Sequence, residues 1–331
     1  MSSSTSSSSS RPAADPPGAP KTAPHRGRYL ALAALLLFTV LEVTTRCVLF
    51  PASKDFSRFA TYPARAAKLS GASGTRLALI GNSATEQGVD LDTFRTELAA
   101  QGTRATVDMF VADASNLNTW YWMLQSEFWK RRRGVDFLII PFFNGLADDG
   151  TLEVPRLALF FTDPSDWADV FRHDLPDFER RVDFVLSSGW ATFGARDRVR
   201  ERALDAIPGY KSYIRDINAV NFAKQERLAR RAPTAPTYKD LGRLLDAARQ
   251  NHAHIVFVAF PLRRSASSAI YDITPETAVL IRDAGMELID LRLFPELRAE
   301  HYDDEIHLNA AGRAIFSPRL AREVSRLVPR T

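Results

Sequence analysis

Three side chains in this sequence have the types and spacing of an acyl-transfer site. Ser83 ends a small turn at 81–83 that directly follows the apolar run 77–80. Far along the chain, Asp304 and His307 are three positions apart in the stretch DEIHLNAAG. An aspartate so placed can orient one imidazole nitrogen, which leaves the other nitrogen to act as a general base. If the two stretches meet in space, they form a nucleophile, a base and an orienting acid.

Each half of this site also has a purely structural interpretation. A serine at a helix N-terminus often caps free backbone N–H groups, and the segment after Ser83 can begin a helix. The Asp304-to-His307 segment can be an ordinary helix start with Asn309 as its cap.

A third interpretation is a metal site made of His301, Asp303, Asp304 and His307, which no other strand end supports. The turn at 81–83 lacks both the lysine of a phosphate loop and the glycine spacing of a dinucleotide site, so no cofactor is expected.

Five apolar runs are predicted to be the strands that position these residues. They are continuous rather than alternating, which indicates burial on both faces, and they span 76–80, 105–111, 135–143, 254–260 and 286–291. Helices are predicted between and after them at 90–101, 118–132, 238–251, 274–284 and 309–326. This alternation predicts a three-layer α/β/α fold around a mostly parallel five-stranded sheet.

In an open sheet of this kind, ligands bind beyond the carboxyl ends of the strands. The stretch Asp113-Ala114-Ser115-Asn116 follows the second predicted strand, and Asn144 follows the third. A helix that starts at Ser83 would aim N–H groups at an anion formed beside that serine. Trp120 and Trp122 begin the next predicted helix; packing is the expected role for them, and stacking on sugar rings is an alternative.

The chain divides into segments of different composition. Residues 1–28 form a Ser- and Pro-rich tail that cannot bury a core, and 29–50 are predicted to form an uncleaved membrane-spanning signal-anchor helix, in which Glu42 and Arg46 lie on one face. A linker is predicted at about 51–74. The domain is predicted at 75–331, with a helical insertion at about 146–237 that has no buried strand.

Charge and cysteine content exclude some classes of function. The formal net charge is +4, but acids are interspersed with the bases, and the cluster at 130–133 is typical of a solvated helix end. We therefore expect no nucleic-acid partner. The single cysteine, Cys47, lies in the apolar segment, so the domain has no internal disulfide and no cysteine-ligated metal.

These motifs resemble those of the SGNH/GDSL hydrolase superfamily. The stretch LALIGNSATEQGVD (77–90) is similar to its first block, with Asn82 in the place of the usual aspartate, and DEIHLNAAG is similar to its last block. The resemblance implies a flavodoxin-like sheet, Ser83 as nucleophile, His307 as base and Asp304 as its partner. It also implies an oxyanion hole made of the Ser83 N–H, the Asn144 side chain and a second-block N–H. The usual second-block glycine is missing, so Ala114 or Ser115 occupies that position, and the third block keeps only its asparagine.

The order of segments is similar to that of membrane-anchored, extracytoplasmic members that accompany polysaccharide acylation. It implies a single-pass protein of the bacterial inner membrane with its domain outside, and an acylated glycan or small ester as substrate. A membrane-bound acyltransferase or polysaccharide assembly protein is the implied partner. The expected activity is that of a serine esterase or O-acyltransferase, with acetyl as the expected group. The alternatives are a lipid- or thioester-directed hydrolase and a degenerate domain that binds a glycan or a partner.

Overall fold

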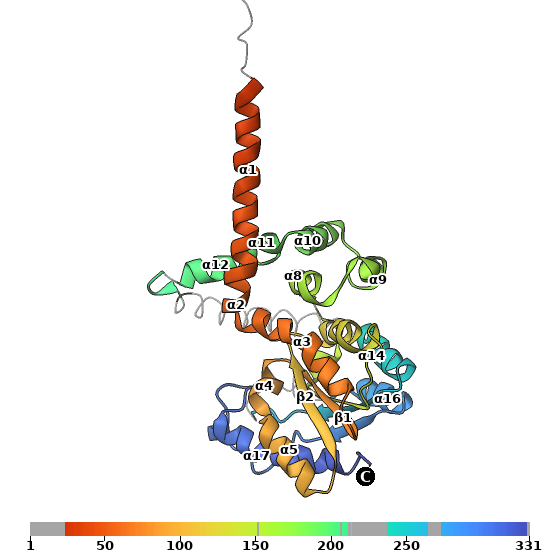
Figure 1. Ribbon diagram of the computed structural model, residues 1–331. Helices are drawn as coiled ribbons and strands as arrows, with labels where there is room; N and C mark the ends of the chain where they lie inside the picture. The colour runs from red at the N-terminus through yellow and green to blue at the C-terminus, as the bar shows by residue number, and fades with distance from the viewer. Residues whose placement is uncertain are drawn as a thin grey trace, which may run out of the picture.

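The computed structural model describes residues 24–150, 152–205, 207–210, 213, 237–263 and 273–329. Its centre is a five-stranded sheet made of β1 (Thr75–Gly81), β2 (Ala105–Val111), β3 (Phe137–Phe142), β4 (His254–Ala259) and β5 (Glu287–Asp290). All neighbouring strands pair in parallel, in the order β2-β1-β3-β4-β5 (Figure 1). The predicted parallel α/β fold is confirmed, and each strand lies within two residues of its predicted range.

Helices connect the strands and cover both faces of the sheet. Outside the insertion they are α1 (Pro24–Thr44), the π-helical turn η1 (Thr45–Leu49), α2 (Phe50–Ala52), α3 (Lys54–Ser70), α4 (Ser83–Gly88), α5 (Leu91–Ala100), α6 (Leu117–Leu124), the π-helical turn η2 (Gln125–Trp129), α14 (Lys239–Gln250), α16 (Pro275–Asp283), the 3-10 turn η5 (Ala299–His301) and α17 (Ala310–Ser325). The predicted helices after strands one, two, three and four and at the C-terminus are all present.

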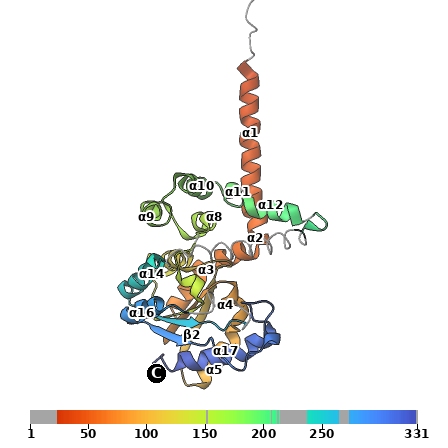
Figure 2. The same cartoon turned by 180° about the vertical axis from the view of Figure 1, so that it is seen from behind.

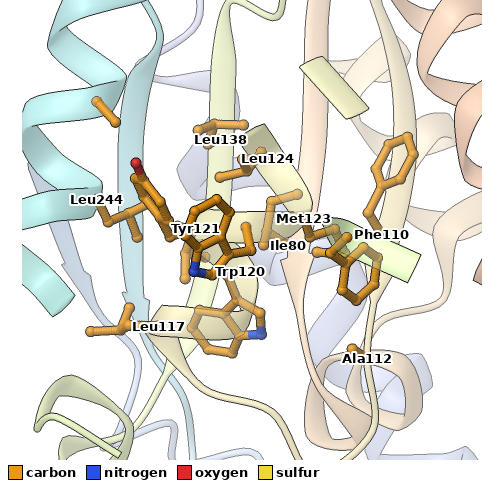
Figure 3. Close-up of a cluster of buried hydrophobic side chains, with 14 of the residues drawn as sticks. Ile80, Phe110, Ala112, Leu117, Trp120, Tyr121, Met123, Leu124, Leu138 and Leu244 are labelled. Carbon is orange, nitrogen blue, oxygen red and sulfur yellow. The ribbon is translucent and has the colours of Figure 1, made fainter. Parts of the chain in front are cut away.

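Two hydrophobic cores lie on opposite faces of the sheet. On β1, Ala78 and Ile80 face the core that includes α3, α6 and α14, while Leu77 and Leu79 face the core that includes α5 and α17. Figure 3 shows part of the first core, where side chains of α6 lie between α14 and β2. Because both faces are covered, consecutive positions in the middle of the strands are apolar, which explains the continuous apolar runs.

Residues 54–70 were expected to belong to a linker, and this expectation is wrong because they form helix α3. Its apolar side chains recur every three or four residues and are buried, namely Phe56, Phe59, Tyr62, Ala66 and Leu69. The Tyr62 hydroxyl also accepts a hydrogen bond from the Val111 N–H (2.8 Å) and donates one to the Val111 carbonyl (2.6 Å). Helix α3 therefore closes the first core at the end of β2.

The described part of the predicted insertion is helical. Its elements are α7 (Asn144–Ala147), α8 (Val154–Arg156), the π-helical turn η3 (Leu157–Phe161), the 3-10 turn η4 (Pro164–Asp166), α9 (Trp167–His173), α10 (Phe178–Gly189), α11 (Ala191–Gly194) and α12 (Arg196–Asp205). Most of 206–236 in the predicted insertion lies outside the described residues.

Arg243 of α14 links the insertion to helices α6 and α14, which cover one face of the sheet. Its guanidinium lies 3.9 Å from the centre of the Tyr121 ring and pairs with Asp169 at 2.5 Å and Asp174 at 2.9 Å. Such charge-assisted contacts over an aromatic face combine cation–π attraction with directional hydrogen bonds. The insertion is therefore joined to α6 and α14 through one partly buried cation.

The N-terminal helix projects away from the sheet (Figures 1 and 2). Residues Gly27–Ala52 form one helix of 26 residues whose length and composition suit a membrane span, and a signal sequence meets the same criteria. Arg46 and Glu42 form the predicted ion pair on one helix face, at 2.8 Å. The tail at 1–23 lies outside the described residues.

The buried hydroxyl of Tyr62 gives a test of how α3 is held. We expect Tyr62→Phe to lower the free energy of unfolding by about 1–3 kcal/mol, because both backbone groups of Val111 would lose their buried partner. Urea unfolding measures the change. The control Tyr213→Phe, at a side chain that is 63% exposed, should change stability by less than about 0.5 kcal/mol. Equal effects of the two substitutions would contradict a structural role for this hydroxyl.

Candidate active site

Ser83, His307 and Asp304 form a continuous chain of hydrogen bonds at the carboxyl edge of the sheet. The Ser83 Oγ lies 2.9 Å from His307 Nε2, and His307 Nδ1 lies 2.7 Å from Asp304 Oδ2. Ser83 and His307 are 224 positions apart in the sequence. The two stretches that the sequence singled out therefore meet, with the order of contacts that a nucleophile, a base and an orienting acid require.

The end of β1 turns sharply into α4, which starts at Ser83. The turn requires glycine at position 81, because a Cβ there would lie 1.9 Å from Thr85 Oγ1. The N-cap of α4 is Asn82, whose side-chain oxygen accepts from the Ala84 N–H at 3.0 Å. The capping interpretation of Ser83 is thus wrong: Asn82 caps the helix, and the Ser83 hydroxyl is directed to His307.

A short loop before α17 presents His307. The loop is closed by a bridge between Tyr302 and Leu308 and by a bond from the Asp303 N–H to the His307 carbonyl (2.9 Å). Asn309 caps α17, as one interpretation of this segment expected, by accepting from the Gly312 N–H at 3.0 Å. The segment therefore both caps α17 through Asn309 and pairs His307 with Asp304, so the two interpretations of this stretch are compatible.

Asp304 is held in its ionised form. Burial acts to raise the pKa of Asp304, but the His307 side chain and the backbone N–H groups of Ile306 and His307 donate hydrogen bonds that outweigh it. The pKa of Asp304 is therefore below its usual value. An ionised acceptor keeps the proton of the neutral imidazole on Nδ1 and leaves Nε2 free to accept the serine proton.

The second-block loop lies against the Ser83 turn. The Asn82 amide donates to the Ser115 carbonyl at 3.2 Å, a bond that the aspartate usual in the first block cannot donate. Ala114 has φ +50°, the left-handed conformation that favours glycine. The missing glycine of this block is thus replaced by an alanine that keeps a glycine-like backbone.

The side chain of Ser115 has a structural use. Its hydroxyl donates to the Ala112 carbonyl (2.6 Å) and accepts from the Trp120 indole N–H (2.7 Å). Ser115 can therefore contribute to an oxyanion hole only through its backbone. The Ser83 N–H is in the first turn of α4, where N–H groups have no partner within the helix.

Asn144 is the first residue of α7 and follows β3 at the same edge of the sheet. Its backbone position agrees with a role at the carboxyl edge, whereas its side chain lies outside the described part of the structure. Its part in an oxyanion hole stays a prediction.

The sequence did not reveal that Arg58 of α3 supports both sides of the site. Its guanidinium pairs with Glu86 of α4 at 3.0 Å and with Asp113 of the second-block loop at 3.2 Å, and also with Asp55. Burial alone would lower the pKa of Arg58, but Tyr62 and these three acids raise it above its usual value. The apolar residues that recur every three or four positions in 56–69 could have predicted helix α3, and with it the position of Arg58.

Trp120 and Trp122 have the packing role that was expected, and the alternative of stacking on sugar rings is wrong. Their exposed fractions are 0% and 2%, and the Trp122 indole N–H donates to Asp174 at 3.0 Å. Figure 3 shows Trp120 within the core. Both rings pack under the insertion and offer no face to a ligand.

The metal interpretation finds no support in the geometry of its four residues. His307 and Asp304 bond to each other, and the His301 ring accepts from the Arg298 N–H at 3.0 Å. Among the described residues, no three His, Cys, Asp or Glu side chains cluster closely enough to hold a metal ion.

Comparisons with known proteins return only distant structural neighbours. No family model and no curated protein matches the chain. A lipase/acylhydrolase from Enterococcus faecalis is 12% identical, with a TM-score of 0.41 over 77% of this chain and 97% of its own. An acetyl xylan esterase is 12% identical, with a TM-score of 0.38 over 75% and 99% of the two chains. A GDSL-like lipase from Bacteroides thetaiotaomicron is 8% identical, with a TM-score of 0.35 over 81% and 98%.

The left-handed backbone at Ala114 predicts an unusual effect of glycine. We expect Ala114→Gly to raise the free energy of unfolding by up to about 1 kcal/mol, because the strain of a Cβ in this region exceeds the entropy cost of glycine. Urea unfolding measures the change. The control Ala112→Gly, at a buried position without positive φ, should destabilise by about 1 kcal/mol. A loss of stability at both positions would contradict strain at Ala114.

Proposed function

We propose that this protein is a membrane-anchored serine esterase or O-acyltransferase that acts on acylated glycans at the cell surface or outside the cell, with acetyl as the expected group. The observation that carries the proposal is the bonded chain Ser83–His307–Asp304 beyond the carboxyl ends of the strands. The turn into α4 places backbone N–H groups beside the nucleophile, as acyl transfer requires.

The first half of the reaction makes an acyl-enzyme. The Ser83 oxygen bonds to the ester carbonyl carbon while its proton passes to His307 Nε2, and the carbonyl oxygen takes the negative charge. The Ser83 N–H, a backbone N–H at Ala114 or Ser115, and the Asn144 amide are proposed to hold that oxygen. When the intermediate collapses, the ester C–O bond breaks, and the leaving alcohol takes the proton from His307.

The second half returns the enzyme to its starting state. A hydroxyl group gives its proton to His307 and attacks the acyl carbon, and Ser83 leaves and recovers the proton. Water as the acceptor gives ester hydrolysis, and a sugar hydroxyl gives O-acyl transfer. Asp304 stays ionised throughout and stabilises the imidazolium that forms in each half.

A cavity beside the His307 loop, lined by both apolar residues and arginines, supports a charged glycan as substrate. It has a volume of about 510 Å³ and is lined by Arg263, Arg292, Arg298, Tyr302 and apolar residues of the segment 293–297. Tyr302 bridges to Leu308, next to His307, and the Arg263 N–H donates to the Glu305 carbonyl at 3.0 Å. Arg292 pairs with Asp290 at 2.7 Å, and Arg263 and Arg298 beside the Tyr302 ring suit a sugar that carries negative charge.

The proposed location is the bacterial inner membrane, with α1 as a single span and the sheet domain outside. The length and composition of the helix Gly27–Ala52 support the anchor. A membrane-bound acyltransferase or polysaccharide assembly protein is the proposed partner, since a glycan acylated at the membrane would meet the site there.

Labelling with a fluorophosphonate tests whether Ser83 is an activated nucleophile. The full chain in detergent should be labelled at one site, and Ser83→Ala should abolish labelling, because the reagent captures only a deprotonatable serine beside a base and oxyanion donors. The control Ser57→Ala, at an exposed serine of α3, should keep full labelling. An unlabelled native protein, or equal labelling of Ser83→Ala, would show that the site is not a serine-hydrolase centre.

Asn144→Ala tests the third oxyanion donor. We expect the rate of acetyl-ester hydrolysis to fall by about 10²-fold or more, with a much smaller change in KM, because the amide would bind the oxygen mainly once it is charged. The control Asn251→Ala, at an exposed residue after α14, should keep the native rate. A fall of less than about 3-fold for Asn144→Ala would remove this residue from the proposed oxyanion hole.

A further inference from the structure

Helix α10 exposes apolar side chains along one face. Phe178 is 80% exposed, Val182 39%, Val185 37% and Leu186 41%. Their spacing of four, three and one residues places them on one side of the helix. Side chains on the side of α10 that faces the protein include Phe184 and Ser187, which are buried. Apolar patches of this kind on a protein surface mark interaction sites.

Three of the four charged residues of α10 are bonded within the protein, and the fourth, Glu179, is exposed in the first turn of the helix. Arg181 donates from Nε to the Leu175 carbonyl at 2.7 Å, and Arg180 donates to the Leu152 carbonyl at 3.1 Å. Asp183 pairs with Arg196 at 2.9 Å. A helix at a water-exposed surface has the reverse pattern, with its charges outward and its apolar residues inward. The pattern of α10 therefore suits an apolar medium on its outer side.

The residues that follow α10 contact helix α1. Trp190 directly follows α10, and its ring lies 5.0 Å from the ring of Phe38. The Glu42 carboxylate accepts from the N–H groups of Ala191 and Thr192, each at 3.0 Å. Figures 1 and 2 both show α11 beside the lower part of α1 and α10 at the same level, next to α11, whereas α5 lies at the opposite end of the molecule.

The position of these contacts along α1 fixes their depth if α1 spans a membrane. Phe38 is 11 residues after Gly27 and 14 before Ala52, the bounds of the apolar helix, so it lies about 17 Å and about 21 Å from the two ends. A hydrocarbon core is about 30 Å thick. Every placement of such a core along this helix includes the level of Phe38, and therefore the level of Trp190.

The same depth explains the bonds of Glu42. A carboxylate at that level is costly unless it is paired. Arg46 pairs with it at 2.8 Å, and the first turn of α11 supplies two N–H groups. The insertion thus provides polar partners to a charge that the membrane cannot solvate.

We propose that α10 and residues 190–193, here named the collar, lie in the leaflet nearer the catalytic domain, with the apolar face of α10 in contact with lipid acyl chains. A shallow groove of about 360 Å³ on this face is lined by Val182, Leu186 and Phe193, and its polar side carries two arginines and two acids, namely Glu179, Arg180, Asp183 and Arg196. Acyl chains fit the apolar part, and the charged side suits the headgroup region. The inference rests on the membrane anchor of the proposed function, and it adds that the insertion fixes the height of the active site above the bilayer.

Single-cysteine labelling tests the collar in the full chain. In a Cys47→Ser background, which removes the single native cysteine, Val182→Cys and Val185→Cys are labelled with a bimane fluorophore in nanodiscs of phosphatidylcholine and phosphatidylglycerol. Nitroxide-labelled lipids should quench both labels at least about 2-fold more than a label at Ala99→Cys on α5. A label at Leu36→Cys on α1 reports the anchor.

The outcomes separate the collar from the anchor. Quenching at 36, 182 and 185 but not at 99 supports the collar. Quenching at 36 alone overturns the collar and leaves the anchor in place. This result is expected if α10 binds a partner protein instead of lipid, because the nanodiscs contain lipid and no partner. Absence of quenching at all four positions overturns both. Fluorophosphonate labelling of each variant at Ser83 shows that the sheet domain is intact and tests the proposed chemistry separately.

Discussion

The hydrogen bond between Ser83 and His307 is the constraint around which the rest of this structure is arranged. It joins side chains 224 residues apart, so both must be held by elements whose positions are fixed. A parallel sheet meets this need because it brings the carboxyl ends of its strands to one edge. β1 ends in the turn that holds Ser83, and the loop of His307 closes on itself before α17, which packs on the face of the same sheet that carries α5. Asp304 fixes the orientation of the imidazole through one hydrogen bond to Nδ1. Asp304 is itself held by bonds from the backbone N–H groups of Ile306 and His307.

At two positions the sequence differs from the motifs that it resembles, and in both cases the structure explains the difference through contacts between the first and second loops. Asn82 replaces an acid. Its side-chain oxygen caps α4, and its amide nitrogen donates to the Ser115 carbonyl. Ala114 replaces a glycine and keeps the left-handed backbone that glycine would adopt. Because a side-chain bond ties the first loop to the second, the geometry of the proposed oxyanion hole depends on backbone shape rather than on the identity of the residue at position 114.

The N-terminal segment and the insertion both bond to the part of the chain that holds the candidate site. Arg58 of α3 pairs with Glu86 of α4 and with Asp113 of the second-block loop, and α3 continues from the apolar helix through a single break near Ser53. The insertion bonds to that apolar helix at Glu42 and to α14 through Arg243. The apolar N-terminal helix, the insertion and the sheet domain are therefore linked by partly buried charges, which are directional and costly to separate once desolvated.

The sequence by itself determined the strands, the order of helices and the two stretches that meet at Ser83 and His307, because periodicity and turn chemistry are local properties. The helical spacing of the apolar residues of α3 is also present in the sequence, at Phe56, Phe59, Tyr62, Ala66 and Leu69. The many charged and small residues between them obscured this spacing. Only the tertiary structure decided that Asn82 rather than Ser83 caps α4, that Ala114 is left-handed, that Trp120 is buried and that α10 turns its apolar face outward. Each of these depends on which surfaces come together across long sequence separations, and a pattern of residue types does not specify which side of a helix meets the core.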